Sequence, residues 1–276
     1  MTLTIRPTSA LRAALCAALT IAAALLPALA PSRACAQPTT PEGDKLEILS
    51  RARYNVLDEG AFVISKNGKP VRAEEFSIER SRDTLVVRAS SMVALPGQAE
   101  RPVDKSMVLL VSALDFAMGT YWSQFAAGPD TLRRGVELFG ADTVATIWRQ
   151  INRAGMGDRV AMPPGRLYIL DPPLFTTFNF LGRTLQGKPC DRRPIKVFVL
   201  GQQDTLVDAT VTEVGNETLR WGGRPVLTRK LVIADETTSF TGWYTPDGRM
   251  LRLEQPTNGI RVDRRAPPLK RQPPRR

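Results

Sequence analysis

The chain contains no histidine, and this absence limits the chemistry that its other side chains could perform. It excludes Ser–His–Asp and Cys–His catalysis, His-ligated zinc sites and acid–base work by imidazole. Paired carboxylates, as in glycoside hydrolysis, are the main catalytic option that the 27 acidic residues leave. Turn chemistry explains acids such as Asp171 and Asp247, and neither Asp-Thr-Gly nor S-x-x-K occurs. We therefore predict a non-enzymatic protein with no catalytic residues, no metal site and no cofactor.

The stretch from Gly182 to Lys188 has the G-x-x-x-x-G-K spacing of a phosphate-binding loop. Pro189 follows it, where such a loop needs Ser or Thr to supply a hydroxyl group to magnesium. Proline also lacks the backbone N–H that the loop would donate, and the preceding segment is rich in Phe instead of forming a clean strand. We therefore predict no nucleotide binding.

Arg229 is the sharpest single-residue candidate for ligand binding. It alternates with Leu227, Leu231 and Ile233, so it lies on the apolar face of a predicted strand. A charge there is costly unless it is paired or reaches water. The favoured interpretation is a side chain that extends to water at a sheet edge, or that pairs with a neighbouring Glu or Asp. The alternative is a clamp for a carboxylate or phosphate, which would fit a lipid with an anionic head.

Large aromatic side chains are the other candidates for a ligand site. They are Trp122, Trp148, Phe175, Phe178, Phe180, Trp221 and Trp243. Such residues are most often core, but a curved sheet with little helix needs something to fill its concavity. Both interpretations stay open. As ligand-binding residues we select Arg229, Trp122, Trp148, Phe178 and Trp243.

Short strands joined by tight turns would position these residues. Asn67-Gly68 is a strong hairpin signal because both residues tolerate positive φ. Trp221-Gly222-Gly223 and Pro246-Asp247-Gly248 are further turns between apolar runs. Many short strands at nearly regular spacing indicate an antiparallel meander. We predict a mainly β fold: a single long antiparallel meander forming a curved sheet or half-open barrel, with little helix apart from a signal peptide.

Three segments fit more than one conformation, and a loop follows the third. Residues 107–127 fit either a buried helix or two strands, and residues 142–152 show both spacings. We favour strands for both. The segment from Leu174 to Leu181, with three phenylalanines, predicts a buried loop or a short helix, and the segment from Gly182 to Pro194 predicts a loop.

The N-terminus has the features of a secretory signal peptide. Arg6 and Arg12 precede an uncharged stretch from Ala13 to Ala30. The stretch is rich in Ala and interrupted by Pro27, which favours a cleaved signal over a retained membrane anchor.

Small residues follow this stretch. Ala34-Cys35-Ala36 before Gln37 fits an A-x-A cleavage pattern, so we predict cleavage between Ala36 and Gln37. Arg33 makes the sequence before Cys35 a poor lipobox, and lipoprotein anchoring through Cys35 is disfavoured. We expect export to the periplasm or the extracellular space.

Composition divides the chain into four parts. We predict a signal peptide over 1–36, a flexible segment over 37–53, an antiparallel β domain over 54–264 and a disordered, basic, proline-rich tail over 265–276. After cleavage, 35 basic and 27 acidic residues remain, and residues 261–276 supply +6 of the net charge of +8. Most of the net positive charge therefore lies at the C-terminal end of the chain. This tail could contact an anionic envelope surface. We expect no nucleic-acid partner. Cys190 is then the only cysteine, so no internal disulfide is possible.

Several passages together resemble bacterial envelope proteins of unknown function. They run from Gly165 to Pro172, from Ile195 to Leu200, from Thr228 to Leu231 and from Trp243 through Asp247-Gly248-Arg249 to Leu251. The long meander of those proteins is thought to be related to the half-barrel of periplasmic lipoprotein carriers and lipid-binding envelope proteins. The resemblance covers residues 55–262 and implies a curved sheet whose apolar concave face could hold a lipid or lipid-like chain. It carries over no catalytic residue.

These observations lead to functions of different classes. The first is an exported, non-catalytic protein that binds an apolar or lipid-like ligand. The second is a structural or assembly protein with a solid core that acts through protein–protein contacts, and a weaker third is a carboxylate-based hydrolase. A cavity lined by the aromatic candidates favours the first, whereas a filled interior with exposed apolar surface favours the second. Two acids about 5–9 Å apart in a cleft would favour the third.

Overall fold

The computed structural model describes residues 54–95, 98–127, 130–138, 144–152, 154–162, 167–201 and 203–267. The predicted signal peptide, its cleavage site at Ala36 and Gln37, and the segment 37–53 lie outside the described residues. Of the predicted tail, only residues 265–267 are described.

Fifteen strands join into one sheet in these described ranges. They are β1 (Asn55–Lys66), β2 (Lys69–Ser81), β3 (Thr84–Leu95), β4 (Gln98–Ser112), β5 (Met118–Ala127), β6 (Asp130–Leu138), β7 (Val144–Ile151), β8 (Ala154–Ala161), β9 (Leu167–Leu170), β10 (Asp191–Val199), β11 (Thr205–Trp221), β12 (Arg224–Ala234), β13 (Ser239–Tyr244), β14 (Met250–Gln255) and β15 (Ile260–Arg264). The same ranges contain one α-helix, α3 (Thr176–Thr184), and one short 3-10 helix, η1 (Pro256–Asn258). The predicted mainly β meander is therefore confirmed.

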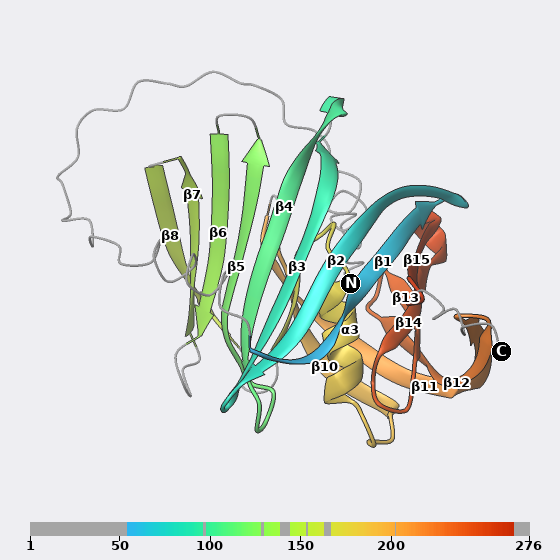
Figure 1. Ribbon diagram of the computed structural model, residues 1–276. Coiled ribbons are helices and arrows are strands. Elements are labelled where there is room, and N and C mark those ends of the chain that lie inside the picture. Colours follow the sequence, from blue (N-terminus) through green and yellow to red (C-terminus); the bar gives the residue numbers. More distant parts are fainter. Residues whose placement is uncertain are drawn as a thin grey trace, which may run out of the picture.

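The sheet is curved and open, as Figure 1 shows. Strands that follow each other in the chain pair antiparallel, except that β8 and β9 do not pair and that β9 runs parallel to β10. The first and last strands pair with each other, with Ile64 opposite Val262, so the ends of the meander meet in the middle of the sheet. This pairing leaves β8 and β9 as the two edges, and the sheet does not close into a barrel.

The predicted turns have the backbone conformations that their residues favour. Asn67 and Gly68 join β1 to β2 with φ values of 50° and 78°. Gly222 and Gly223 join β11 to β12 with φ values of 59° and 76°. Positive φ is costly for most L-residues, which explains why Asn and Gly stand at these positions.

Strands occupy both segments whose sequence fitted helix as well as strand. Residues 107–127 form the end of β4, a turn around Asp115 and β5, and residues 144–151 form β7. The helix, α3, begins in the segment from Leu174 to Leu181 that was predicted as a loop or short helix, and it continues three residues beyond it. Its last turn reaches Thr184 and β10 begins at Asp191, so the loop predicted from Gly182 to Pro194 is shorter than expected. No helix among the described residues is long and apolar enough to cross a bilayer.

Helix α3 lies on the concave side of the sheet (Figure 1). Eight of its nine residues are buried, and Phe178, Phe180 and Leu181 belong to the main hydrophobic core. The helix is therefore the element that fills the concavity of the open barrel. Its polar side chains Asn179 and Arg183 contact the buried Asp58 carboxylate instead of facing solvent, which is how a helix with polar residues can be buried on all sides.

Two glycines let the β13–β14 turn approach the helix closely. A Cβ atom on Gly182 would lie 2.2 Å from the Tyr244 ring and 2.6 Å from the Gly248 carbonyl oxygen. A Cβ atom on Gly248 would lie 2.8 Å from the Arg183 Cα atom. The G-x-x-x-x-G-K spacing thus begins inside a packed helix, which gives Gly182 a packing role in place of phosphate binding.

Side chains close part of the gap between the two ends of the sheet. Arg134 on β6 donates to the Gly201 carbonyl oxygen at 2.7 Å. Arg149 on β7 forms an ion pair with Asp204 at 2.6 Å, in the turn between β10 and β11. Strands β6, β7 and β8 at this end of the sheet are called the wing here, and β8 is its edge strand.

Candidate functional site

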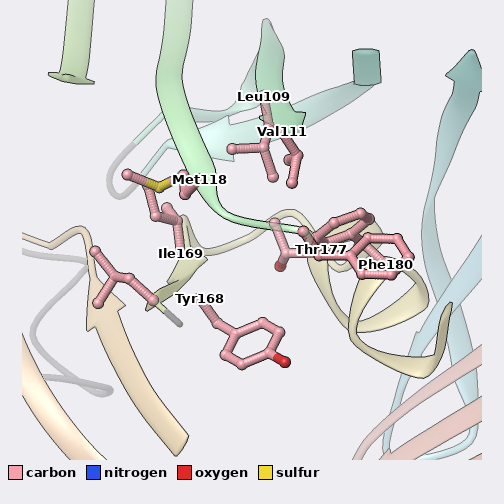
Figure 2. A pocket seen from close by; sticks show the side chains of 9 residues that line it. Leu109, Val111, Met118, Tyr168, Ile169, Thr177 and Phe180 are labelled. Atoms are coloured by element: carbon pink, nitrogen blue, oxygen red, sulfur yellow. The ribbon is translucent and has the colours of Figure 1, made fainter. Parts of the chain in front are cut away.

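The concave interior is the site that a lipid-like ligand would need, and side chains fill it. The gap that remains has a volume of about 10 Å³. Side chains from β4, β5, β9 and α3 converge on it, among them Leu109, Met118, Tyr168 and Phe180 (Figure 2). A space of this size holds about one water molecule. The side chains around this gap therefore pack closely and leave no room for a ligand there.

A carboxylate from the sheet caps the N-terminus of the buried helix. Glu74 on β2 has no solvent exposure and accepts hydrogen bonds from the backbone N–H groups of Phe175 and Thr176, both at 2.8 Å. The Thr176 hydroxyl donates a third bond at 2.6 Å. Burial raises the pKa of Glu74, and these three donors oppose that rise. The cap satisfies helix N–H groups that would otherwise be unpaired and places negative charge where the helix dipole favours it.

Lys105, Asp171 and Tyr121 form a second buried group beside this cap. The Lys105 ammonium lies 2.5 Å from one Asp171 oxygen, and the Tyr121 hydroxyl donates to the other at 2.5 Å. Burial lowers the pKa of Lys105 and raises that of Tyr121 well above its usual value. Such a trio has the composition of an acid–base site, but Lys105 and Tyr121 have no exposed surface and Asp171 only 1%. A substrate has no access, so this trio anchors the turn before α3.

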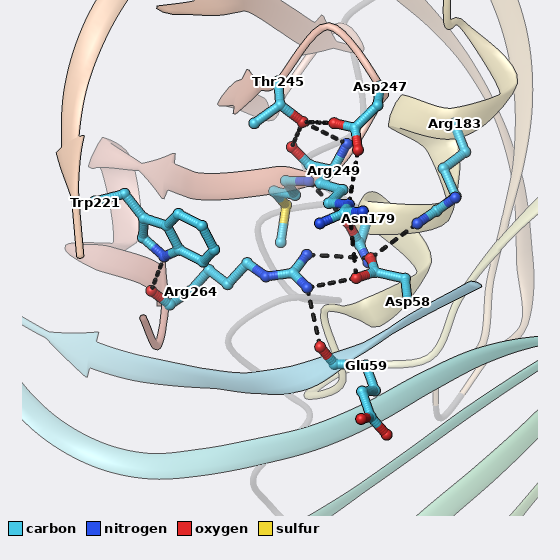
Figure 3. A network of polar contacts seen from close by, with 10 residues as sticks. Asp58, Glu59, Asn179, Arg183, Trp221, Thr245, Asp247, Arg249 and Arg264 are labelled. Atoms are coloured by element: carbon cyan, nitrogen blue, oxygen red, sulfur yellow. Dashed lines mark hydrogen bonds and ion pairs between the residues drawn. The ribbon is translucent and has the colours of Figure 1, made fainter. Parts of the chain in front are cut away.

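A third polar network surrounds Asp58 at the other end of the helix (Figure 3). Arg264 on β15 donates to both Asp58 oxygens, at 3.1 and 2.5 Å, and Asn179 on α3 donates at 3.2 Å. Arg183 lies 3.2 Å from the same carboxylate. Burial raises the pKa of Asp58, but the bonds and charges of Arg264 and Arg183 outweigh it, and the pKa is lowered. The network ties β1, β15 and α3 together.

Arg229 pairs with an acid, as the favoured interpretation of its sequence predicts. Its guanidinium group makes two hydrogen bonds to Glu213, at 3.2 and 2.6 Å. It also donates to the carbonyl oxygens of Leu185 at 3.0 Å and Lys188 at 2.7 Å, just after the end of α3. Four donations leave little capacity for a ligand anion, and the clamp stays a prediction.

A solvent-open surface pocket lies beside this ion pair. Its volume is about 330 Å³, and it is lined by Gly187, Lys188, Pro189, Glu213, Arg229 and Pro246. This volume falls at the lower end of the range of about 300–1,000 Å³ that small-molecule sites occupy. None of the four aromatic candidates lines it.

The structure does not bring the aromatic candidates together. Phe178 lies in the main core. Trp122 and Trp148 belong to a second cluster on the opposite face of the sheet, since Tyr121, next to Trp122, points inward. Trp243 lies in a third cluster with Leu219 and Leu251. Of the two interpretations left open by the sequence, these side chains therefore fit core packing better than one shared cavity, and any individual role in binding stays a prediction.

The buried charged residues were the feature that sequence reasoning missed. Asp171 was assigned to turn chemistry; the turn exists, with Leu174 N–H bonded to the Asp171 carbonyl, but its carboxylate belongs to the interior trio. Glu74 alternates with Phe76 and Ile78 on one strand face, and both of those residues are buried. That alternation was the available signal that Glu74 also points inward. Among the described residues, no group of three or more Cys, Asp or Glu could hold a metal ion.

Comparison with known proteins adds a likeness of fold. No family model matches the chain, and no curated protein matches it. It is similar to the crystal structure of a β-barrel-like protein of domain of unknown function DUF1849 from Brucella abortus, with a TM-score of 0.50 and 9% sequence identity. The match covers 78% of this chain and 96% of that chain. At this identity the likeness concerns the fold alone, and the fold is that of a β-barrel-like domain.

Proposed function

We propose that the protein is an exported, non-catalytic assembly protein that acts through contacts with other proteins and carries no lipid in its interior. The observation that carries the proposal is the filled concavity. Helix α3 and the core side chains leave a gap of about 10 Å³, whereas a site for a drug-sized molecule has about 300–1,000 Å³. A lipid chain would have to displace the helix.

The buried ion pairs make that displacement costly. Glu74 and Asp58, both on the sheet, bind donors in the helix segment, whereas Asp171, just before the helix, binds Lys105 on the sheet. Separating one partner from a buried pair costs about 3–5 kcal/mol. Two such pairs, together with the hydrogen-bonded cap at Glu74, favour a rigid interior over one that opens for a ligand.

The surface supports a role in contacts. Several large apolar side chains are exposed, among them Ile151 at 60%, Met156 at 69% and Leu227 at 57%. Ile151 and Met156 lie on neighbouring strands of the wing at its free edge. Exposed apolar surface that gathers in one region is typical of interaction sites. Export rests on the signal-peptide pattern at the N-terminus.

A small-molecule site beside Arg229 is the second candidate, favoured by the surface pocket of about 330 Å³. Its only free cation among the described lining residues is Lys188, since Arg229 is bound to Glu213. Arg229 itself would then shape the pocket without touching the ligand.

Native mass spectrometry of the mature chain, residues 37–276, purified from a bacterial periplasm, tests the proposal. We expect the apo mass, also after incubation with an envelope lipid extract. The variant Phe180→Ala is a positive control for detection, since it removes a core ring that lines the interior gap. A lipid or fatty chain bound to the unaltered protein would refute the filled-interior argument. An adduct that persists in Phe180→Ala but is lost on Lys188→Ala would support the surface pocket instead.

A further inference from the structure

Strand β8 is the free edge of the wing. It pairs with β7 through all eight of its residues, and no strand of the described part of the chain lies on its other side. Seven of its eight side chains are exposed, and Val160 is partly exposed. The opposite edge, β9, is covered, because Leu167, Tyr168 and Ile169 are buried. Of the two edges, only β8 is open to another polypeptide.

The hairpin register shows which backbone groups of β8 are available. Ile151 stands opposite Ala154 across a two-residue turn that contains Asn152, at a φ of 53°. In such hairpins the closing pair exchanges hydrogen bonds, and the direction of the backbone groups then alternates along the strand. Ala154, Met156 and Asp158 therefore face β7, whereas Gly155, Gly157 and Arg159 present their N–H and C=O groups outward.

We propose that β8 adds one antiparallel strand from a partner protein, in which a bulky apolar residue and an acidic residue alternate on the convex face. This inference rests on the proposed function and names the surface that performs it. Strand addition to an open edge is an established mode of peptide recognition, with affinity from the backbone and specificity from alternate side chains.

The side chains of β8 set the chemistry of that partner. Gly157 stands opposite Trp148, whose ring leans over Gly135 on the far side, so a Cβ atom on Gly157 would have no atom nearer than 3.5 Å and the Trp148 ring does not cover it. A bulky side chain on the added strand would cover this position. Arg159, on the same face, is exposed and has no ion pair within the described residues, so an acidic residue complements it. On the concave face, Met156 would pack best against an apolar side chain of the added strand.

A second copy of this chain fits less well. Two copies of β8 paired about a two-fold axis at Gly157 place Met156 opposite Asp158, an apolar side chain against a charge. Pairing about Asp158 places two carboxylates directly opposite each other, which is destabilising. These two registers use most of the strand, so the charge pattern disfavours edge-to-edge dimers.

The test uses the mature chain as bait for a displayed library of random nine-residue peptides. We expect the enriched peptides to alternate a bulky apolar with an acidic residue and to lose about tenfold in affinity, or about 1.4 kcal/mol, for Gly157→Pro. Proline there removes an outward N–H and leaves the bonds to β7 intact. Arg159→Glu should weaken the same peptides, and exchanging their acidic residue for Lys should restore binding. Arg220→Glu, the same change at an exposed position on β11, is the control and should bind normally.

Three outcomes would overturn the proposal. The first is that no peptides are enriched, and the second is that the peptides bind Gly157→Pro as tightly as the unaltered protein. The third is that the unaltered protein is a dimer in analytical ultracentrifugation and that Gly157→Pro makes it monomeric. The charge exchange with Arg159→Glu decides the question if the proline variant fails to fold. Failure of the broader proposal would appear separately, as a lipid adduct in native mass spectrometry, without any change in peptide binding.

Discussion

Replacing Asp58 by Asn should destabilise the protein far more than its single lost charge suggests. The Asp58 carboxylate is 2% exposed and is shared by Arg264, Arg183 and Asn179 (Figure 3). An amide cannot accept from both Arg264 nitrogens, so the Arg264 guanidinium group, 4% exposed, would lose its countercharge. Breaking a buried pair in this way costs about 3–5 kcal/mol. That is a large part of the 5–15 kcal/mol by which domains are usually stable.

Urea unfolding followed by tryptophan fluorescence measures this loss. Trp221 is a suitable reporter because its indole N–H bonds the Arg264 carbonyl oxygen at 3.1 Å. Asp263→Asn is the matched control, since Asp263 also pairs with two arginines but is 36% exposed. Exposed pairs contribute about 0–1 kcal/mol. Equal losses in the two variants would refute the view that Asp58 holds the helix to the sheet.

The stabilising effect of Asp58 should depend on pH, and Asp58→Asn can be used to measure this dependence. The pKa of Asp58 is lowered in the folded protein, because the arginines outweigh the effect of burial. The stability that this group adds is therefore fully present above its unfolded pKa of about 3.9 and is lost as the pH falls through the lower folded value. The gap in unfolding free energy between the unaltered protein and Asp58→Asn should shrink in that acidic range. A gap that stays constant on acidification would contradict this assignment.

Two further changes test the packing of the interior. Gly182→Ala should lower the thermal midpoint strongly, because its Cβ atom would lie 2.2 Å from the Tyr244 ring. Gly155→Ala is the control and should have little effect, because no atom would lie nearer than 3.7 Å to its Cβ atom. Similar midpoints for the two variants would show that the helix and the turn can separate freely. Lys105→Met should cost about 3–5 kcal/mol by leaving Asp171 buried without its cation. Urea unfolding of Lys105→Met/Asp171→Asn should recover part of that loss, and a purely additive double variant would show that the pair is not coupled.

The local features of the sequence predicted much of the sheet. Turns at Asn67-Gly68 and Gly222-Gly223 depend only on the backbone freedom of those residues, and they lie where expected. The pairing of β1 with β15 could not be predicted in this way. It joins residues such as Ile64 and Val262, and nothing in either strand specifies so distant a partner. Alternation tells which face is buried, not which strand lies alongside.

The candidate site shows a similar limit. The aromatic residues left a lined cavity and a packed core both open, and Trp122 and Trp148 lie on the convex face, where they form a small cluster of their own. Composition cannot distinguish the two faces of a sheet when both carry aromatic clusters. The pairing of Arg229 was predictable because its alternation with Leu231 and Ile233 placed a charge where it needed a partner. The same argument, applied to Glu74 beside Phe76, would have located the helix cap.

The buried carboxylates that hold helix α3 limit where the protein can bind a ligand or partner. A protein that releases its central helix to admit a ligand would hold that helix with apolar contacts, which re-form on the ligand. Here the helix is held at one end by Glu74 and at the other by Asp58, through charged contacts that no apolar ligand can replace. Exchange of the helix for a lipid would leave these carboxylates buried and unpaired, at a cost that apolar burial of the ligand would have to exceed. This cost supports the proposal that the interior serves stability and that a partner binds at the free edge of the wing, where exposed backbone groups can pair without breaking a buried contact.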